Sequence, residues 1–201
     1  MWSLLASVVA YKFETSFPFF IPPIPCVSAS SHKNLYRARI VSLLCLLACS
    51  AALSAGAYLN VNDLDPVKIA SNKSYDDVRV LATAEKAVTV EAIPVSREAA
   101  DGEVFNARLK LGGSGNATYR ALSFHGKKGE TLVVYLNSSS KTDARQLALV
   151  NAATKAEVTV FTAPPDDEAH AGKASCAIPA DGTYLLYSKG SGINLYAVIC
   201  E

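Results

Sequence analysis

The sequence contains very little methionine, tryptophan or histidine, and this scarcity limits the chemistry open to it. Its 201 residues include one methionine, one tryptophan and three histidines. His125 has no nucleophile close to it along the chain, and no two histidines have the spacing of a zinc-protease helix. The chain also lacks a Gly-x-Ser-x-Gly motif, and its segment LGGSGNA follows no nucleotide-binding strand–helix pattern. We therefore predict no catalytic site, no bound metal and no cofactor.

Charge is also scarce, and the two signs are almost balanced. Lysine and arginine number 19 and aspartate and glutamate 18, which gives a formal net charge of +1. Nucleic-acid binding normally requires a clustered basic face, and no long basic run is present. Half of the residues are hydrophobic, which is enough for a packed core. The length fits one domain with an additional segment. We expect no nucleic-acid partner.

One acidic loop contains four side chains that could bind a metal. Asp166, Asp167, Glu168 and His170 follow two prolines within a few residues of one another. Such a group can coordinate a metal, but nothing else in the pattern matches a known metal motif. A solvated acidic loop is the interpretation we prefer. The paired carboxylates of a glycosidase leave no pattern in a sequence, because their partnership is spatial.

The N-terminal quarter differs in composition from the rest. Residues 1–34 place four prolines among aromatic side chains, which neither a helix nor a central strand tolerates. In residues 35–57, Arg37 and Arg39 precede the apolar stretch 40–48, which has the length of a signal-peptide core. A membrane-spanning helix needs about 20 apolar residues, so an uncleaved anchor is the less favoured alternative. We interpret residues 1–34 as disordered or as an over-extended start.

Two processing sites are visible, and we predict export with either one. The small residues Ala55 and Ala57 would leave Tyr58 as the mature N-terminus. Alternatively, the segment LLAC resembles a bacterial lipobox, which would make Cys49 a lipidated first residue. The expected location is therefore the periplasm, the cell surface or the extracellular medium. Contact with a membrane would occur only through that lipid anchor.

Two cysteines, Cys176 and Cys200, lie in the presumed mature domain. In an oxidising compartment they could form a disulfide, which would stabilise the fold by roughly 3 kcal/mol. The alternative is that both are small buried hydrophobic residues on neighbouring strands. The sequence does not decide between the two.

Residues 58–201 have the sequence pattern of a single all-β domain. Short runs rich in β-branched and aromatic residues alternate with turn signals such as ADGEV, HGKKGET and PADGT. No helical period is sustained, which favours an antiparallel β-sandwich. The segments YLNVNDLDP and SNKSYDD are expected to wrap the edge of the sandwich. The predicted strands are 76–83, 86–93, 119–124, 131–137, 145–152, 156–163, 174–179, 183–188 and 193–199.

Three phrases carry a family resemblance. They read FNARLKLGGSGNATYRALSF, SSSKTDARQLALV and DGTYLLYSKGSGINLYAVI, and they occur in this order. In this order they resemble an accessory domain of bacterial pectate lyases and related polysaccharide-degrading enzymes. The resemblance covers residues 58–200 and implies a jelly-roll-like β-sandwich that binds carbohydrate. Unlike the usual arrangement of that family, this chain has no lyase domain attached.

The resemblance also suggests where a sugar would bind. An acidic sugar would require arginine or lysine, because arginine grips a carboxylate with two hydrogen bonds and lysine offers a point charge. If the turns 138–141 and 188–192 share one end of the sandwich, Lys141 and Lys189 would approach each other. Purely structural roles compete with this one, for example ion pairs of the arginines with Asp143 or Asp181, or a turn cap by the asparagine. The candidates are Lys110, Arg120, Lys141, Arg145, Lys189 and Asn194.

We therefore predict an exported, non-catalytic carbohydrate-binding module, with an acidic, pectin-type polysaccharide as its expected partner. The alternative from another class is a surface-anchored structural or host-interaction lipoprotein built on the same sandwich. Within the turn 188–192, we expect Gly190 and Gly192 to supply backbone freedom for a tight hairpin. The oligomeric state is not predicted.

Overall fold

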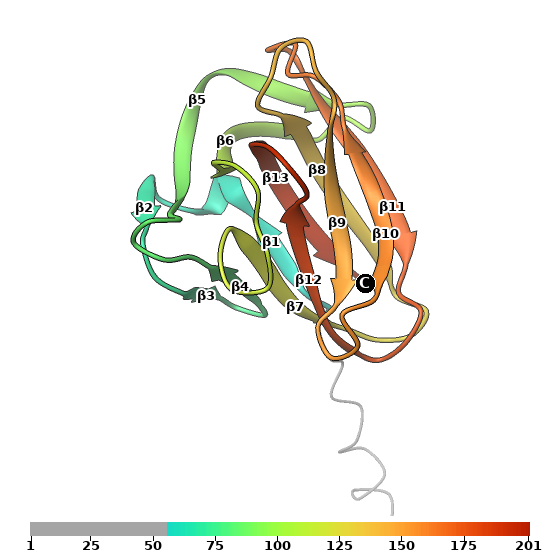
Figure 1. The fold of residues 1–201 in the computed structure, drawn as a ribbon. Coiled ribbons are helices and arrows are strands. Elements are labelled where there is room, and N and C mark those ends of the chain that lie inside the picture. Colours follow the sequence, from blue (N-terminus) through green and yellow to red (C-terminus); the bar gives the residue numbers. More distant parts are fainter. Residues whose placement is uncertain (1–55) are drawn as a thin grey trace, which may run out of the picture. The chain divides into compact units, whose positions relative to one another are not determined.

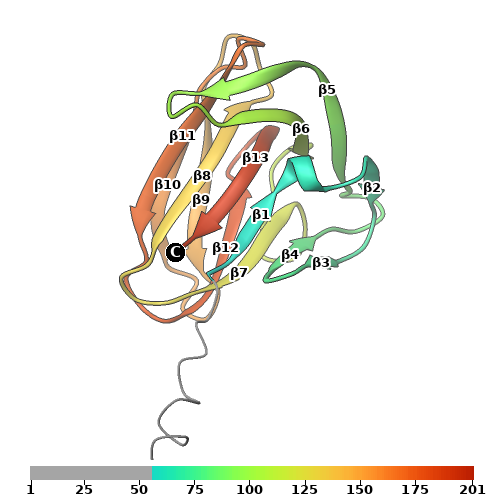
Figure 2. The same ribbon diagram turned by 180° about the vertical axis from the view of Figure 1, so that it is seen from behind.

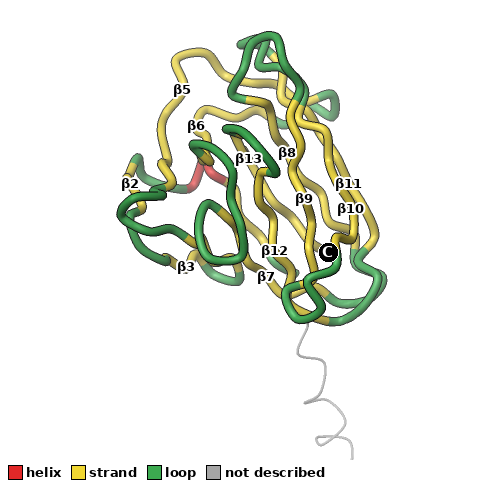
Figure 3. Tube along the Cα trace, in the orientation of Figure 1, coloured by secondary structure: helices red, strands yellow, loops and turns green. Residues whose placement is uncertain are grey.

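The computed structural model describes residues 56–201. The interpretations of residues 1–34, the signal segment through position 55 and the lipidation of Cys49 lie outside these described residues. Figure 1 shows two layers of strands, and Figure 3 shows how little helix joins them. Among the described residues the only helical element is a short 3-10 helix, η1 (Val61–Asp63). No helix between residues 56 and 201 is long and apolar enough to cross a membrane.

Seven strands form the first sheet, in the order β1-β13-β6-β5-β11-β8, with β2 paired to β5. All of its pairings are antiparallel except a short parallel contact between β5 and β11. The bounds are β1 (Tyr58–Asn60), β2 (Val67–Ile69), β5 (Val88–Ala99), β6 (Val104–Leu111), β8 (Thr131–Ser138), β11 (His170–Ala177) and β13 (Ile193–Cys200).

Six strands form the second sheet, in the order β10-β9-β12-β7-β4-β3, and all are antiparallel. The predicted antiparallel β-sandwich is therefore confirmed. The bounds are β3 (Lys73–Tyr75), β4 (Val78–Leu81), β7 (Ala121–Gly126), β9 (Arg145–Asn151), β10 (Glu157–Ala163) and β12 (Gly182–Ser188).

The main core lies between the sheets and follows the two-residue period of each strand. On β8, Leu132, Val134 and Leu136 are fully buried and belong to this core. On β6 the same alternation brings Leu109 and Leu111 inward. Burial of side chains this size contributes about 1.5–3 kcal/mol each, so the alternation fixes the register of these strands.

The first sheet also closes upon itself. Strand β13 pairs with both β6 and β8, and β5 reaches β11, so these pairings form a circuit. The closure depends on a bend in β5 between Ala92 and Arg97, where its register with β6 shifts. Pro94 lies in this bend, where no ladder hydrogen bond is required of it. Figure 2 shows β5 arching over the other strands.

A second apolar cluster fills the side of the first sheet that faces away from the main core. The ring of Phe105 stacks on Tyr196 with centroids 5.3 Å apart and lies 5.1 Å from Tyr135. Ala99 and Ala171, from the ends of β5 and β11, pack against these rings. The sequence patterns did not predict this cluster, because it depends on the bend in β5 rather than on a periodic face.

Candidate functional site

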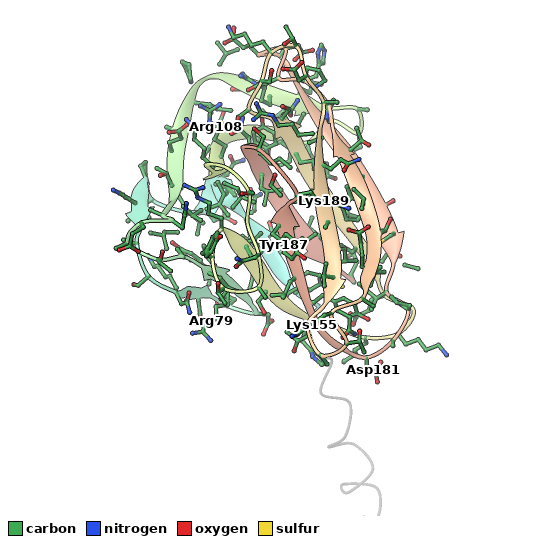
Figure 4. All side chains as sticks on the ribbon, viewed as in Figure 1. Arg79, Arg108, Lys155, Asp181, Tyr187 and Lys189 are labelled. Carbon is green, nitrogen blue, oxygen red and sulfur yellow. The ribbon has the colours of Figure 1, made fainter. Side chains whose placement is uncertain are left out.

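The three candidate lysines, Lys110, Lys141 and Lys189, are each paired with a carboxylate. The Nζ of Lys110 lies 3.4 Å from Glu91, that of Lys141 lies 2.8 Å from Glu168, and that of Lys189 lies 2.8 Å from Glu157. Figure 4 labels Lys189, close to β12, and Arg108, which shares Glu91 with Lys110 and lies close to β6. Each of the three ammonium groups is therefore directed to a carboxylate of its own.

The two turns that carry Lys141 and Lys189 do adjoin, as expected. The amide of Ser139 donates to the carbonyl of Gly192 at 3.0 Å. Arg145 joins the same two residues, because its Nη1 donates to Ser139 Oγ and to the Gly192 carbonyl, both at 2.6 Å. The lysines nonetheless reach carboxylates on different segments. Arg145 thus has a structural role in holding the two turns together.

Arg120 and Asn194 are also held by the fold. Arg120 has a left-handed backbone (φ 49°), and its guanidinium lies against the Gly112–Gly113 backbone. Neither Arg120 nor Arg145 pairs with Asp143 or Asp181 in the described part of the chain. Asn194 does not cap a turn, because it is a fully buried residue of β13 opposite Lys110. Its Nδ2 is 3.5 Å from Asp166 Oδ2.

Cys176 and Cys200 are free thiols in the structure. Both are opposite Leu132 of β8, one on β11 and the other on β13. They are therefore two strand spacings apart, about 10 Å, whereas a disulfide needs Cα atoms within about 7 Å. Burial, together with Glu130, raises the pKa of the Cys200 thiol to about 12. The geometry fits two free thiols, one half-buried and one buried, better than the disulfide that the sequence also allowed.

The acidic loop is solvated only in part. Asp167, Glu168 and His170 are exposed, and Asp167 Oδ2 lies 2.7 Å from His170 Nδ1. Asp166 is instead buried, and its Oδ1 accepts a hydrogen bond from Arg97 Nε at 2.8 Å. Among residues 56–201 no group of three or more histidine, cysteine or acidic side chains is arranged to hold a metal.

A cleft of about 350 Å³ lies between β1 with η1 on one side and the β3–β4 hairpin on the other. In Figure 2 these elements occupy the same part of the molecule. Their sequences are YLNVNDLDP and SNKSYDD, the two segments expected only to wrap the sandwich edge. The side chains and backbone that line it come from Tyr58, Leu59, Asn60, Asp63, Leu64, Ser74, Tyr75 and Asp76.

The first wall of the cleft is anchored to the core. Leu59 and Val61 alternate inward and are buried. Asn62 ties η1 to β6: its Nδ2 donates to the carbonyl of Val104 at 2.9 Å, and its Oδ1 accepts from the amide of Asn106 at 2.8 Å. Asn60 caps η1 through its Oδ1, which accepts from the amide of Asn62 at 3.0 Å. This wall is therefore preorganised.

The second wall is a two-residue hairpin. Tyr75 pairs with Val78, so Asp76 and Asp77 form the turn. Asp76 has a left-handed backbone (φ 44°), which aspartate tolerates better than most residues because its short polar side chain bonds locally. Val78 and Val80 are buried and hold the hairpin on the core.

Two tyrosines give the cleft its aromatic surface. Tyr58 is 47% exposed and is one of three large hydrophobic residues that are exposed in the described part of the chain. Tyr75 is half-buried against the main core, and its hydroxyl is buried without a hydrogen-bond partner among the described residues.

The carboxylates of Asp63 and Asp76 complete the lining. Both residues are exposed, Asp63 at the end of η1 and Asp76 in the hairpin turn. The arrangement offers aromatic rings and carboxylate acceptors within one cavity. Ligand sites combine apolar surface with a few aimed polar groups in this way. A motif search could not find the site, because its two walls are separated in sequence and neither contains a known pattern.

No family model and no curated protein matches the chain. Solved structures share its general arrangement at low similarity. The CBM51-2 and INT domains of Clostridium perfringens ZmpB with GlcNAc show 8% identity and a TM-score of 0.38, over 73% of this chain and 32% of that one. The C-terminal CBM6 of LamC from Zobellia galactanivorans shows 17% identity and a TM-score of 0.35, over 67% and 97%. A Phanerochaete chrysosporium exo-β-1,3-galactanase shows 8% identity and a TM-score of 0.37, over 74% and 30%.

The chain thus spans about a third of the length of the first and the last of these structures. At these TM-scores the similarity does not bear on a ligand or an activity. Any function must be argued from the cleft itself.

Proposed function

We propose that this protein is a carbohydrate-binding module whose ligand site is the cleft between β1–η1 and the β3–β4 hairpin. The observation that carries the proposal is the exposed ring of Tyr58 beside Tyr75, in one cavity with Asp63 and Asp76. A sugar ring has apolar C–H faces and a rim of hydroxyl groups. Aromatic faces suit the former, and carboxylate oxygens accept strong hydrogen bonds from the latter.

The lining disfavours the pectin-type polysaccharide expected from the sequence. A uronic-acid unit would bring its carboxylate next to Asp63 and Asp76, and like charges in a cleft repel each other. The basic residues Lys110, Lys141 and Lys189, which would have attracted such a unit, are paired with carboxylates elsewhere. An acidic glycan would therefore need a surface other than this cleft.

The proposal is tested by glycan-array binding of the purified protein beside Tyr58→Ala. We expect wild-type binding to a glycan without uronic acid and a loss of about tenfold or more in the variant, because truncating a central aromatic contact typically costs more than ~1 kcal/mol. Tyr119→Ala is the matched control, since Tyr119 does not line the cleft. The melting temperature of Tyr58→Ala should remain close to that of wild type, because its ring is exposed.

Two results would contradict the proposal. Equal binding by Tyr58→Ala and wild type would remove the cleft as the site. Retention on no glycan would favour the structural or host-interaction lipoprotein considered for the sequence.

The two carboxylates also make glycoside hydrolysis a second candidate activity, since such enzymes use a pair of acidic residues. A glycosidase acid is typically held in an apolar environment, whereas Asp63 and Asp76 are both exposed. The geometry therefore favours binding over cleavage. Chromatography of a bound oligosaccharide after prolonged incubation separates the two: unchanged length supports a binding module, and shortened products support the enzyme.

A further inference from the structure

The charge of the cleft limits the class of ligand more closely than its shape does. Asp63 and Asp76 are acidic, and the remaining lining residues are neutral. Between residues 56 and 201, no lysine, arginine or histidine forms an ion pair with either carboxylate. By contrast, Lys110, Lys141, Lys173 and Lys189 all have carboxylate partners. The cleft thus holds two negative charges that the described residues leave uncompensated.

Lys73, a lysine next to the cleft, forms no ion pair with either carboxylate. Lys73 Nζ lies over the ring of Tyr75, 4.8 Å from its centroid. This contact shows that the ring attracts a cation, as aromatic faces do. It also directs the ammonium group of Lys73 to the ring rather than to Asp63 or Asp76. A ligand that brings its own positive charge would therefore meet both carboxylates and the second ring, that of Tyr58.

We propose that the cleft selects glycans that carry a protonated amine, that is, units of a 2-amino-2-deoxy hexose. This inference rests on the proposed carbohydrate-binding function and names the class of sugar. The hexose ring lies on Tyr58, its ammonium group faces Asp63 and Asp76, and its hydroxyl groups bond to Ser74 and Asn60. Each ammonium–carboxylate bond is charge-assisted, which makes it about twice as strong as a neutral one.

A sugar explains the cleft better than a basic peptide does. A lysine side chain would satisfy the carboxylates, but it offers no apolar ring face to Tyr58 and no hydroxyl groups to the polar residues. The volume of about 350 Å³ also exceeds what one lysine side chain fills, and it lies at the lower end of the range for small-molecule sites.

The test compares a fully deacetylated glucosamine tetramer with its N-acetylated counterpart by titration calorimetry. At about pH 5.5 we expect the deacetylated tetramer to bind at least tenfold more tightly. The preference should disappear at about pH 9, where most of a primary amine with a pKa near 8 is neutral. It should also weaken at high salt, because the carboxylates are exposed.

Variants assign the preference to the two carboxylates. The double variant Asp63→Asn with Asp76→Asn should bind both tetramers equally, since asparagine keeps the hydrogen-bonding shape without the charge. Asparagine also tolerates the left-handed backbone of position 76, so the hairpin should be retained. The matched control is the double variant Asp65→Asn with Asp77→Asn. These neighbouring aspartates are exposed and do not line the cleft.

The outcomes separate this inference from the proposed function. Equal wild-type affinity for the two tetramers would overturn the amine preference and leave carbohydrate binding intact. Binding of neither tetramer, nor of any other glycan, would overturn both. If a tetralysine peptide binds more tightly than the deacetylated tetramer, the cleft is a site for basic peptides and the inference is wrong.

Discussion

Gly190 and Gly192 lie two residues apart in the same turn, but only one of them is constrained by its surroundings. A Cβ atom at Gly192 would lie 2.6 Å from Ser139 Oγ and 3.3 Å from the carbonyl of Leu111. A Cβ atom at Gly190 would meet nothing within 4 Å. Neither glycine is among the described residues with positive φ, so the expected backbone freedom is not what this turn requires. Gly192 is needed for close packing of the two turns.

Gly192→Val should therefore destabilise the protein, whereas Gly190→Val should not. We expect a loss of about 1–3 kcal/mol for the former, because larger side chains in packed sites force neighbouring groups to move. Gly190→Val, the matched control, should stay within about 0.5 kcal/mol of wild type, as exposed substitutions usually do. Urea unfolding curves measure both. Coincident curves for Gly192→Val and wild type would contradict the packing argument.

At the scale of single elements, β5 depends on a buried ion pair. Arg97, just after the bend, donates through Nε to Asp166 at 2.8 Å, and their side chains are only 4% and 8% exposed. Arg97 Nη1 also donates to the carbonyls of Val95 and Glu168, at 2.6 and 2.7 Å. Burial lowers the pKa of Arg97, but the hydrogen bond and charge of Asp166 outweigh it and raise the pKa above its usual value. The pair thus fastens β5 to the loop before β11.

Asp166→Ala should cost about 3–5 kcal/mol of unfolding free energy, because it leaves the buried guanidinium of Arg97 without its counter-charge. Asp167→Ala is the control in the next position of the same loop. Its partner His170 is exposed, and an exposed ion pair contributes at most about 1 kcal/mol. Chemical denaturation of the two variants measures the difference. Similar losses for both would show that burial of the pair does not matter.

The observed strands also show which sequence patterns were sufficient to predict a strand. Seven of the predicted runs, from 119–124 to 193–199, coincide in large part with β7 to β13, because alternating apolar residues and polar turns determine such strands locally. Strand β6 was missed, although its residues from Phe105 to Leu111 alternate between buried and less buried in the structure. Its sequence, VFNARLKL, contains three polar or charged side chains, and from Phe105 onward they alternate with apolar ones, so the two-residue period of a half-buried strand was already present in the sequence.

At the scale of the whole molecule, the site could not be predicted from local patterns. The sequence indicated the sandwich, and the two turns that meet at Arg145 were expected to share one end of it. The cleft instead depends on β1–η1 and the β3–β4 hairpin facing each other across the fold. No local pattern in YLNVNDLDP or SNKSYDD encodes that approach. The lysines, similarly, were chosen without knowledge of the glutamates that long-range folding places beside them.

Closure of the first sheet has a consequence for acid stability. Asp101, in the turn between β5 and β6, accepts hydrogen bonds through Oδ2 from Lys173 Nζ of β11 at 2.7 Å and from Tyr135 OH of β8 at 2.6 Å. These bonds, that from Lys173 first, lower the pKa of Asp101 to about 2. In the unfolded chain an aspartate has a pKa of about 3.9. The folded protein therefore binds this proton less readily than the unfolded chain does.

The stability that Asp101 contributes should be fully present above about pH 4 and should be lost as the pH falls through about 2. Hydrogen bonds from His170 and its neighbours also hold the pKa of Asp167 well below its usual range, so wild-type stability declines in acid for more than one reason. The difference between wild type and Asp101→Asn isolates one of them. We expect the melting temperature of the variant to be lower than that of wild type at neutral pH and to converge with it toward pH 2. Melting curves that stay a constant interval apart from neutral pH down to pH 2 would show that Asp101 does not couple closure of the sheet to its own ionisation.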